Sequence, residues 1–139
     1  MAKARVLFLC VHNSARSQVA EGMLREWASD RFEPHSAGNE ATVVRPLAIK
    51  VMAEIGIDIS RQRSKAVTEF GDQPFDYAIT VCDDAKEACP YFPGAGRQLH
   101  WSFDDPAQAQ GSEDEKLAEY RRIRDEIAAS ISDFAEAGP

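Results

Sequence analysis

The chain has 139 residues, of which 44% are hydrophobic, and a formal net charge of −7 at pH 7. This length suits one well-packed domain and is too short for two of ordinary size, so we expect a single domain over residues 1–139. No apolar run reaches the roughly 20 residues that cross a bilayer, and too few residues precede the first predicted strand for a secretory signal. The Lys and Arg residues are interspersed with acids, which argues against a nucleic-acid-binding surface. We therefore expect a cytoplasmic protein that binds neither membranes nor nucleic acid.

Predicted strands and helices alternate along the chain. Residues 5–10 (RVLFLC) form an apolar run typical of a buried parallel strand, and residues 17–27 have the apolar spacing of a helix. The later segments predict a strand at 32–37, a helix at 45–55 ended by Gly56, a short helix at 64–70 capped by Ser64, strands at 77–81 and 98–101, and a helix at 113–134. This alternation is typical of an α/β fold, here a four-stranded parallel sheet with helices on both faces.

The turn between the first strand and the first helix carries the strongest chemical signal. It holds the Cys10 thiol and the Arg16 guanidinium at the two ends of one short segment. A helix N-terminus has unpaired N–H groups that bind oxyanions, and an arginine can hold two oxygens at once. The same positive field favours the thiolate of Cys10, which is its nucleophilic form. We therefore predict that Cys10 is a nucleophile and that an oxyanion binds to the residues that follow it: Val11, His12, Asn13, Ser14, Ala15, Arg16 and Ser17.

Each of these residues also has a structural interpretation. A cysteine at the end of a strand commonly fills a core, an arginine commonly lies on the surface, and Ser14 or Ser17 could cap the helix. The combination of all three between a strand and a helix favours the oxyanion site. His12 fits a solvent-facing position as well as a place at the mouth of the site.

The chain resembles the low-molecular-weight tyrosine phosphatases and, within that fold, the thioredoxin-coupled arsenate reductases. The phosphatase signature is a Cys, five residues, then Arg and Ser or Thr, placed after one strand at the N-terminus, and Cys10, Arg16 and Ser17 match it. The resemblance covers the whole chain and implies the strand order 2-1-3-4. The chain departs from these reductases in having Val11 and His12 where small residues and Gly are frequent.

The chain has three cysteines, Cys10, Cys82 and Cys89. Cys82 directly follows the predicted strand at 77–81, so it lies at the same edge of the sheet as Cys10. A helix between Cys82 and Cys89 would separate their Cα atoms by about 10.5 Å, whereas a disulfide needs roughly 4.4 to 6.8 Å. We predict a redox switch in which this segment is helical when reduced and loops out when a disulfide forms. The alternatives are two inert core thiols, or a zinc site completed by His100.

Residues 103–107 (FDDPA) form a further polar cluster. An Asp before a Pro commonly marks only a turn. The phosphatase fold carries its general acid on such an Asp-Pro loop, so the resemblance implies that Asp105 is the proton donor, with Asp104 as its neighbour.

The resemblance implies that the chain reduces arsenate to arsenite, for arsenic detoxification. Cys10 attacks arsenic, Cys82 then attacks Cys10, and Cys89 attacks Cys82, which leaves a redox disulfide between Cys82 and Cys89. Thioredoxin is the implied reductant, and NADPH is consumed by thioredoxin reductase. Because the chain has no glycine-rich dinucleotide turn, we expect no bound cofactor. We also expect a monomer.

Two other functions use part of the same residues. A phosphatase acting on phosphotyrosine or a small phosphomonoester would use Cys10, Arg16 and Asp105, but it would leave Cys82 and Cys89 without a role. A non-enzymatic oxyanion-binding module would need no reactive thiol at all.

A metal site is not expected. Some relatives hold a potassium ion near the loop Asn and the Ser after the second strand, for which Asn13 and Ser36 are candidates here. The nearby Arg63 and Lys65 disfavour a cation.

Overall fold

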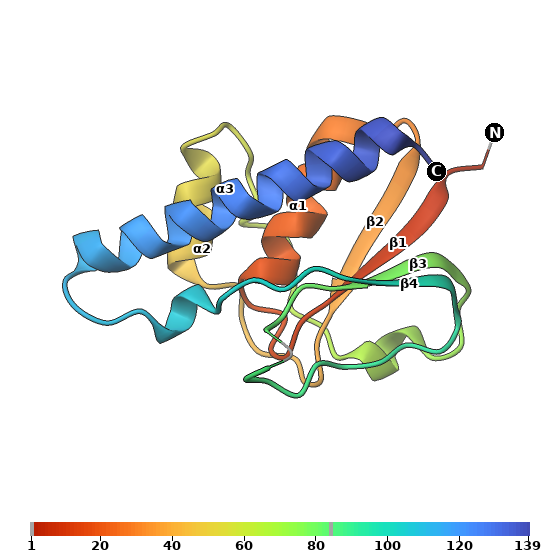
Figure 1. Ribbon diagram of the computed structural model, residues 1–139, viewed down its shortest axis with the longest axis horizontal. Coiled ribbons are helices and arrows are strands. Elements are labelled where there is room, and N and C mark those ends of the chain that lie inside the picture. Colours follow the sequence, from red (N-terminus) through yellow and green to blue (C-terminus); the bar gives the residue numbers. More distant parts are fainter. Residues whose placement is uncertain (1, 84) are drawn as a thin grey trace.

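Four parallel strands form the centre of the structure. In the computed structural model, which describes residues 2–83 and 85–139, the strands are β1 (Ala4–Leu9), β2 (Phe32–Ala37), β3 (Phe75–Thr80) and β4 (Ala95–His100). They pair in parallel in the order β2-β1-β3-β4 (Figure 1). This confirms the predicted parallel sheet and its strand order.

Helices follow β1, β2 and β4 along the chain. They are α1 (Arg16–Ala28), α2 (Pro46–Ala53) and α3 (Glu113–Ala137), with two short 3₁₀ helices, η1 (Val67–Phe70) and η2 (Pro106–Gln108). The three α-helices lie close to their predicted bounds. The prediction of a helix capped by Ser64 is wrong, because only η1 forms there, after Ala66 in extended backbone. The Ser64 hydroxyl instead accepts from the N–H of Thr42 and donates to the carbonyl of His12.

The two faces of the sheet are covered differently. On one face, buried strand residues pack with residues of α1, α2 and α3 in one core cluster. The buried residues of the other face come from strands, from η1 and from the loop before β4: Leu7, Leu9, Ala37, Phe70, Phe75, Ala78 and Phe92. Helices therefore cover both faces unequally, with three α-helices on one and the short η1 on the other.

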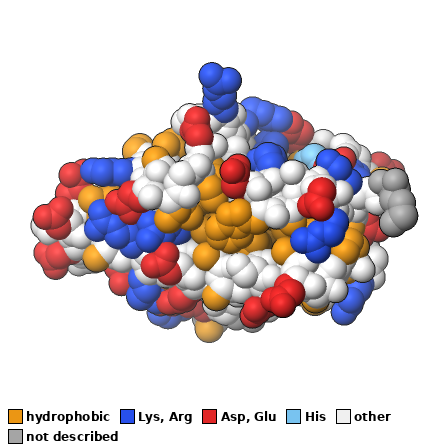
Figure 2. All heavy atoms as spheres, turned by 90° about the horizontal axis from the view of Figure 1, so that it is seen from above, with side chains coloured by type: hydrophobic (Ala, Val, Ile, Leu, Met, Phe, Trp, Pro, Cys, Tyr) orange, Lys and Arg blue, Asp and Glu red, His pale blue; other side chains and the backbone are white. Residues whose placement is uncertain are grey.

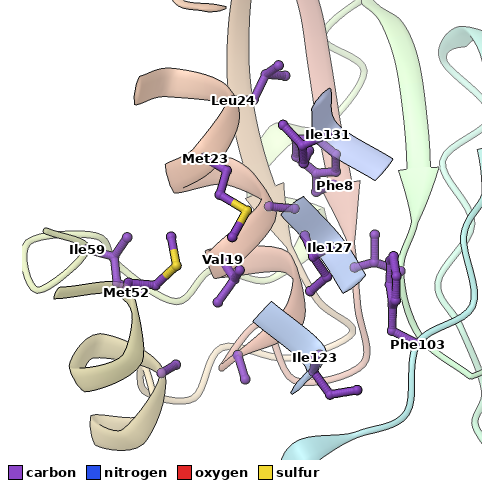
Figure 3. Close-up of a cluster of buried hydrophobic side chains, with 14 of the residues drawn as sticks. Phe8, Val19, Met23, Leu24, Met52, Ile59, Phe103, Ile123, Ile127 and Ile131 are labelled. Carbon is purple, nitrogen blue, oxygen red and sulfur yellow. The ribbon is translucent and has the colours of Figure 1, made fainter. Parts of the chain in front are cut away.

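The larger core is built around α1. Figure 3 shows Val19 and Met23 of α1 between Met52 of α2 and Ile127 of α3. Helix α3 begins with a capping box, in which the Ser112 hydroxyl accepts from the N–H of Glu115 and the Glu115 carboxylate accepts from the N–H of Ser112. A stripe of α3 residues is buried against the rest of the core, and it includes Leu117, Tyr120, Ile123, Ile127 and Ile131.

Charges of both signs are mixed on the surface that Figure 2 shows. On this face, Lys and Arg alternate with Asp and Glu around a central group of hydrophobic side chains, and neither sign forms a continuous patch. Among the helices of the described residues, none combines the length and the apolarity that a bilayer crossing requires.

Ile127→Ala tests the packing of α3 on the core. Ile127 is fully buried, so its truncation should lower the free energy of unfolding by about 2 to 5 kcal/mol. Urea denaturation followed by circular dichroism measures this change. Val43→Ala is the control, since Val43 is 69% exposed and its truncation should change stability by no more than about 0.5 kcal/mol. Equal losses in the two variants would contradict the packing described.

Candidate active site

Residues 10–17, here called the oxyanion loop, connect the end of β1 to the first turn of α1. The N–H of Cys10 donates to the carbonyl of Ala37, which extends the pairing of β1 with β2 by one residue. Ala15 is the N-cap residue of α1 and has no side-chain acceptor. The N–H groups of the first turn of α1 are therefore not satisfied by their N-cap side chain, as an anion-binding helix N-terminus requires.

Asn13 fixes the shape of this loop. Its backbone has a φ of 48°, in the left-handed region that Asn tolerates better than most residues. The Asn13 side chain is fully buried. Its Oδ1 accepts from the N–H of Lys65 at 2.8 Å and from Gln18 Nε2 at 2.9 Å, while its Nδ2 donates to Ser17 Oγ at 2.8 Å. The amide thus joins the α1 end of the loop to the chain that follows α2.

The backbone of the loop is held from the β2 side. The carbonyl of Val11 accepts from the N–H of Asn39, and that of Ser14 accepts from the N–H of Arg45. The His12 side chain is 45% exposed, with Nδ1 3.2 Å from Glu40. His12 thus lies at the rim of the site, which agrees with the interpretation that placed it at the mouth.

Gly38 is a residue of the site that the sequence did not reveal. A Cβ at this position would lie 2.7 Å from the carbonyl oxygen of Val11 and 2.8 Å from the nitrogen of Asn13. Both atoms belong to the backbone and cannot rotate away. The end of β2 can approach the oxyanion loop this closely only because residue 38 has no side chain.

Arg16 is almost completely buried, and both of its terminal nitrogens are paired. Its Nη1 and Nη2 donate to the two carboxylate oxygens of Glu87 at 2.5 and 2.7 Å, and Nη1 also donates to the carbonyl of Phe103 at 3.1 Å. Burial alone would lower the pKa of Arg16, but the hydrogen bonds to Glu87 and nearby negative charges raise it. The guanidinium predicted to hold an oxyanion holds Glu87 in this structure. Nothing in the pattern of the sequence singled out Glu87.

The expectation of a stabilised Cys10 thiolate is wrong for this conformation. Cys10 is a free thiol and only 3% exposed. Burial raises the pKa of the Cys10 thiol, and the charges of Glu87 and Asp105 raise it further. The charge of Arg16 acts in the opposite direction but does not outweigh them. The helix N-terminus is present as predicted, but burial, together with the two carboxylates, outweighs the charge of Arg16 and leaves the pKa of Cys10 raised.

Cys82 and Cys89 are joined in a disulfide, with their Cα atoms 6.1 Å apart. This separation lies within the range that a disulfide needs. Cys82 is fully buried and Cys89 is partly exposed. Sulfurs that are bonded to each other cannot ligate zinc, and no cluster of three or more His, Cys, Asp or Glu within residues 2–83 and 85–139 could hold a metal ion.

The sheet register brings Cys10 and Cys82 to one edge. Leu9 pairs with Thr80, and the N–H of Val81 donates to the carbonyl of Leu9. Both cysteines belong to the same buried cluster, on the face that carries the α-helices. Figure 1 shows the loop after β3 beside the loop between β1 and α1.

Residues 82–89, here called the redox segment, form no helix over their described part, which excludes residue 84. The carbonyl of Asp83 accepts from the N–H groups of Lys86 and Glu87, which makes a single turn. The predicted helix belongs to the reduced form, so this disulfide form does not test it.

The acid loop, residues 103–107, turns its two carboxylates in different directions. Asp104 is 57% exposed and pairs with Arg122 of α3 at 3.0 Å. Asp105 is 15% exposed, and its Oδ2 lies 3.7 Å from Arg16 Nη2. Its Oδ1 accepts from the N–H of Ala107 at the start of η2. Of the two carboxylates, Asp105 is therefore the one beside the oxyanion loop.

Three polar side chains, those of Glu21, Ser36 and Lys65, form a cluster near the oxyanion loop. Ser36 Oγ donates to Glu21 Oε1, and Lys65 Nζ lies 3.8 Å from the same oxygen. Burial lowers the pKa of Lys65, and the charge of Glu21 opposes this effect. The ammonium of Lys65 thus supplies positive charge close to Ser36, one of the two residues considered for a potassium site.

A cleft of about 600 Å³ opens in front of these groups. The oxyanion loop contributes Val11 and His12 to its wall. The remaining lining comes from the redox segment and from the acid loop with the residues after it: Asp83, Lys86, Glu87, Ala88, Asp104, Asp105 and Gln108. The oxyanion loop, the acid loop and the redox segment therefore meet around one opening.

The sequence profile of the low molecular weight phosphotyrosine protein phosphatases matches residues 5–137. The chain belongs to this family. An arsenate reductase of Halalkalibacterium halodurans is 46% identical over 138 residues, which cover 99% of each chain. An arsenate reductase solved in a phosphate-binding state superposes with a TM-score of 0.79 at 27% identity, covering 98% of this chain and 99% of the other.

A thioredoxin-dependent arsenate reductase of Corynebacterium glutamicum superposes with a TM-score of 0.60 at 30% identity, covering 94% of this chain and 62% of the other. The resemblance inferred from Cys10, Arg16 and Ser17 is therefore confirmed, both for the phosphatase fold and for its arsenate reductase branch.

Gly38→Ala tests the close approach of β2 to the oxyanion loop. The added methyl group must push the backbone at Val11 and Asn13 away, so the affinity of the reduced protein for inorganic phosphate should fall by at least about tenfold. Isothermal titration calorimetry measures this affinity. Gly96→Ala in β4 is the control, because its Cβ would approach the nearest backbone atom less closely, at 3.3 Å, and would touch no atom of the oxyanion loop. Unchanged affinity in Gly38→Ala would contradict the geometry.

The pH dependence of Cys10 alkylation tests its raised pKa in the disulfide form. Because only the thiolate reacts, a raised pKa keeps alkylation by iodoacetamide slow at pH 7, and the rate should still be rising above about pH 8.5, the ordinary thiol pKa. The other two cysteines are bonded and do not react. Glutathione serves as the unperturbed thiol for comparison. A plateau in the Cys10 rate below the pH where glutathione levels off would show that its pKa is not raised.

Proposed function

We propose that this chain reduces arsenate to arsenite through a relay of its three cysteines. The observation that carries the proposal is the disulfide between Cys82 and Cys89 at the sheet edge that also carries Cys10. The match to arsenate reductases over nearly the whole chain supports it.

In the first step, arsenate binds to the oxyanion loop. The N–H groups of the loop and of the first turn of α1 surround it, and Arg16 binds two of its oxygens. The Cys10 thiolate attacks arsenic while Asp105 protonates the departing hydroxide, which leaves as water. The product is a covalent adduct with a bond between the Cys10 sulfur and arsenic(V).

In the second step, the electrons move to arsenic. The Cys82 thiolate attacks the Cys10 sulfur, a disulfide forms between them, and the sulfur–arsenic bond breaks with its electron pair passing to arsenic. Arsenite leaves. The Cys89 thiolate then attacks Cys82, which frees Cys10 and leaves the Cys82–Cys89 disulfide. Two thiols have lost two electrons, and arsenic has gained them.

A dithiol protein of the thioredoxin type then restores the thiols. Its nucleophilic thiolate needs an accessible sulfur, and the partial exposure of Cys89 supplies one while Cys82 is buried. The similarity to a thioredoxin-dependent reductase supports this choice of partner. NADPH would be used by thioredoxin reductase and not by this chain.

Three further expectations belong to the same proposal. The chain acts as one domain over residues 1–139, as a monomer, and in the cytoplasm, where thioredoxin keeps thiols reduced. The roles given above to Cys10, Arg16, Asp105 and the two relay cysteines are part of the proposal.

A phosphatase is the second candidate, because Cys10, Arg16 and Asp105 would also suit hydrolysis through a cysteinyl-phosphate. The bonded pair of cysteines favours the reductase, since hydrolysis of a phosphomonoester involves no electron transfer and needs no second or third sulfur.

Cys82→Ser separates the two functions. NADPH oxidation in the presence of arsenate, thioredoxin and thioredoxin reductase should fall to the rate without enzyme, because Cys10 can no longer be released from its adduct. Hydrolysis of p-nitrophenyl phosphate should persist at the wild-type rate.

Cys10→Ser is the matched control and should lose both activities. Arsenate turnover by Cys82→Ser at the wild-type rate would refute the relay. A wild-type chain that turns over arsenate only with glutathione and glutaredoxin would refute thioredoxin as the partner.

A further inference from the structure

The carboxylate of Glu87 occupies the two terminal nitrogens of Arg16, which could otherwise bind an oxyanion. Both of its oxygens are bound by the two terminal nitrogens of the guanidinium. This is the two-point geometry in which arginine binds carboxylates, phosphates and similar oxyanions. The Arg16 side chain is 2% exposed and that of Glu87 is 17% exposed, so the pair is largely shielded from solvent.

Contacts within the redox segment hold Glu87 in this position. Glu87 Oε1 accepts from the N–H of Asp83 at 2.9 Å, and the N–H of Glu87 donates to the carbonyl of Asp83 at 2.9 Å. Asn39 Nδ2 donates to the carbonyl of Ala88 at 2.9 Å. The disulfide closes the segment around these contacts, because Glu87 lies between its two cysteines.

The charges around Arg16 do not attract a second anion in this form. Its guanidinium faces Glu87 and also lies within 3.7 Å of Asp105. The wall of the cleft carries four carboxylates, against Lys86 and the rim residue His12: Asp83, Glu87, Asp104 and Asp105. An incoming oxyanion would meet a negative opening and an arginine that is already paired.

We propose that Glu87 is an internal substitute for the oxyanion, bound to Arg16 while Cys82 and Cys89 are joined and withdrawn when they are reduced. This inference rests on the proposed function, because it makes substrate binding depend on the state of the relay. An enzyme whose relay pair is oxidised cannot release arsenic from Cys10. With Glu87 on Arg16, that enzyme does not bind arsenate and forms no trapped adduct.

The release follows from the reduction itself. A dithiol reductant transfers two electrons and two protons, the Cys82–Cys89 bond breaks to give two thiols, and the reductant becomes a disulfide. The Cα atoms of the pair are then no longer held 6.1 Å apart and can move toward the roughly 10.5 Å that a helical segment requires. That movement alters the turn that presents Glu87 to Arg16.

The affinity for inorganic phosphate in the two redox states tests this inference. The disulfide form, recognised by one free thiol, and the reduced form, recognised by three, are titrated with phosphate by calorimetry. The wild-type disulfide form should bind phosphate at least about tenfold more weakly than the reduced form. In Glu87→Gln the difference should fall below about twofold, because the disulfide form gains affinity.

Glu40→Gln is the matched control. Glu40 pairs with His12 at the rim and not with Arg16, so this variant removes a charge near the site and should keep the wild-type difference. A second measurement is the alkylation of Cys10 in the disulfide form, which should be faster in Glu87→Gln at pH 7 because the charge of Glu87 raises the thiol pKa.

Two results would overturn the inference. Equal phosphate affinity of the two wild-type forms would show that Glu87 does not respond to the disulfide. A difference that persists in Glu87→Gln would show that another part of the redox segment closes the site. Either result is compatible with normal arsenate turnover by the reduced enzyme. If the proposed function were wrong, arsenate turnover would be absent, while the difference in phosphate affinity between the two redox forms would remain.

Discussion

The buried guanidinium of Arg16 is the group around which the site is organised. A charge removed from water in this way is costly unless an anion and further hydrogen bonds compensate it. Here the compensation comes from Glu87, from the carbonyl of Phe103 and from the nearby Asp105. The oxyanion loop, the acid loop and the redox segment all reach this one side chain. In the disulfide form the chain itself therefore supplies the anion that pairs with Arg16.

The parallel sheet brings the three parts of the site together around Arg16. Parallel strands end at the same edge, so Cys10 after β1 and Cys82 after β3 are neighbours without any special loop. The end of β2 comes within backbone contact of the oxyanion loop at Gly38. The buried amide of Asn13 then holds the loop to the chain beyond α2. Rigid elements thus place Cys10, and the proposed relay assigns the change in redox state to the segment after β3.

The family to which the chain belongs is named for phosphatases, and its relatives here are arsenate reductases. The two chemistries share the nucleophilic cysteine, the arginine and the acid loop, since both begin with attack on a tetrahedral oxyanion. They differ in what removes the covalent adduct: water for a phosphoryl group, a second thiol for arsenic. In the proposed relay the second thiol comes from the segment after β3, which in this chain contains Cys82, Cys89 and the carboxylate that pairs with Arg16.

The amino-acid sequence by itself determined the order of strands and helices, the oxyanion loop from Cys10 to Ser17, and the pair of later cysteines. These features follow from local periodicity, from helix and turn chemistry, and from a short motif, all of which can be recognised over a few residues. Only the tertiary structure decided that Glu87 pairs with Arg16 across 71 residues of chain and that Gly38 must lack a side chain. It further showed that Ser64 hydrogen-bonds to the oxyanion loop and does not cap a helix. It also reversed the expected direction of the Cys10 pKa. The physical reason is the same in each case: burial, close backbone approach and pairing of charges depend on residues that are distant in the chain and become neighbours only when it folds.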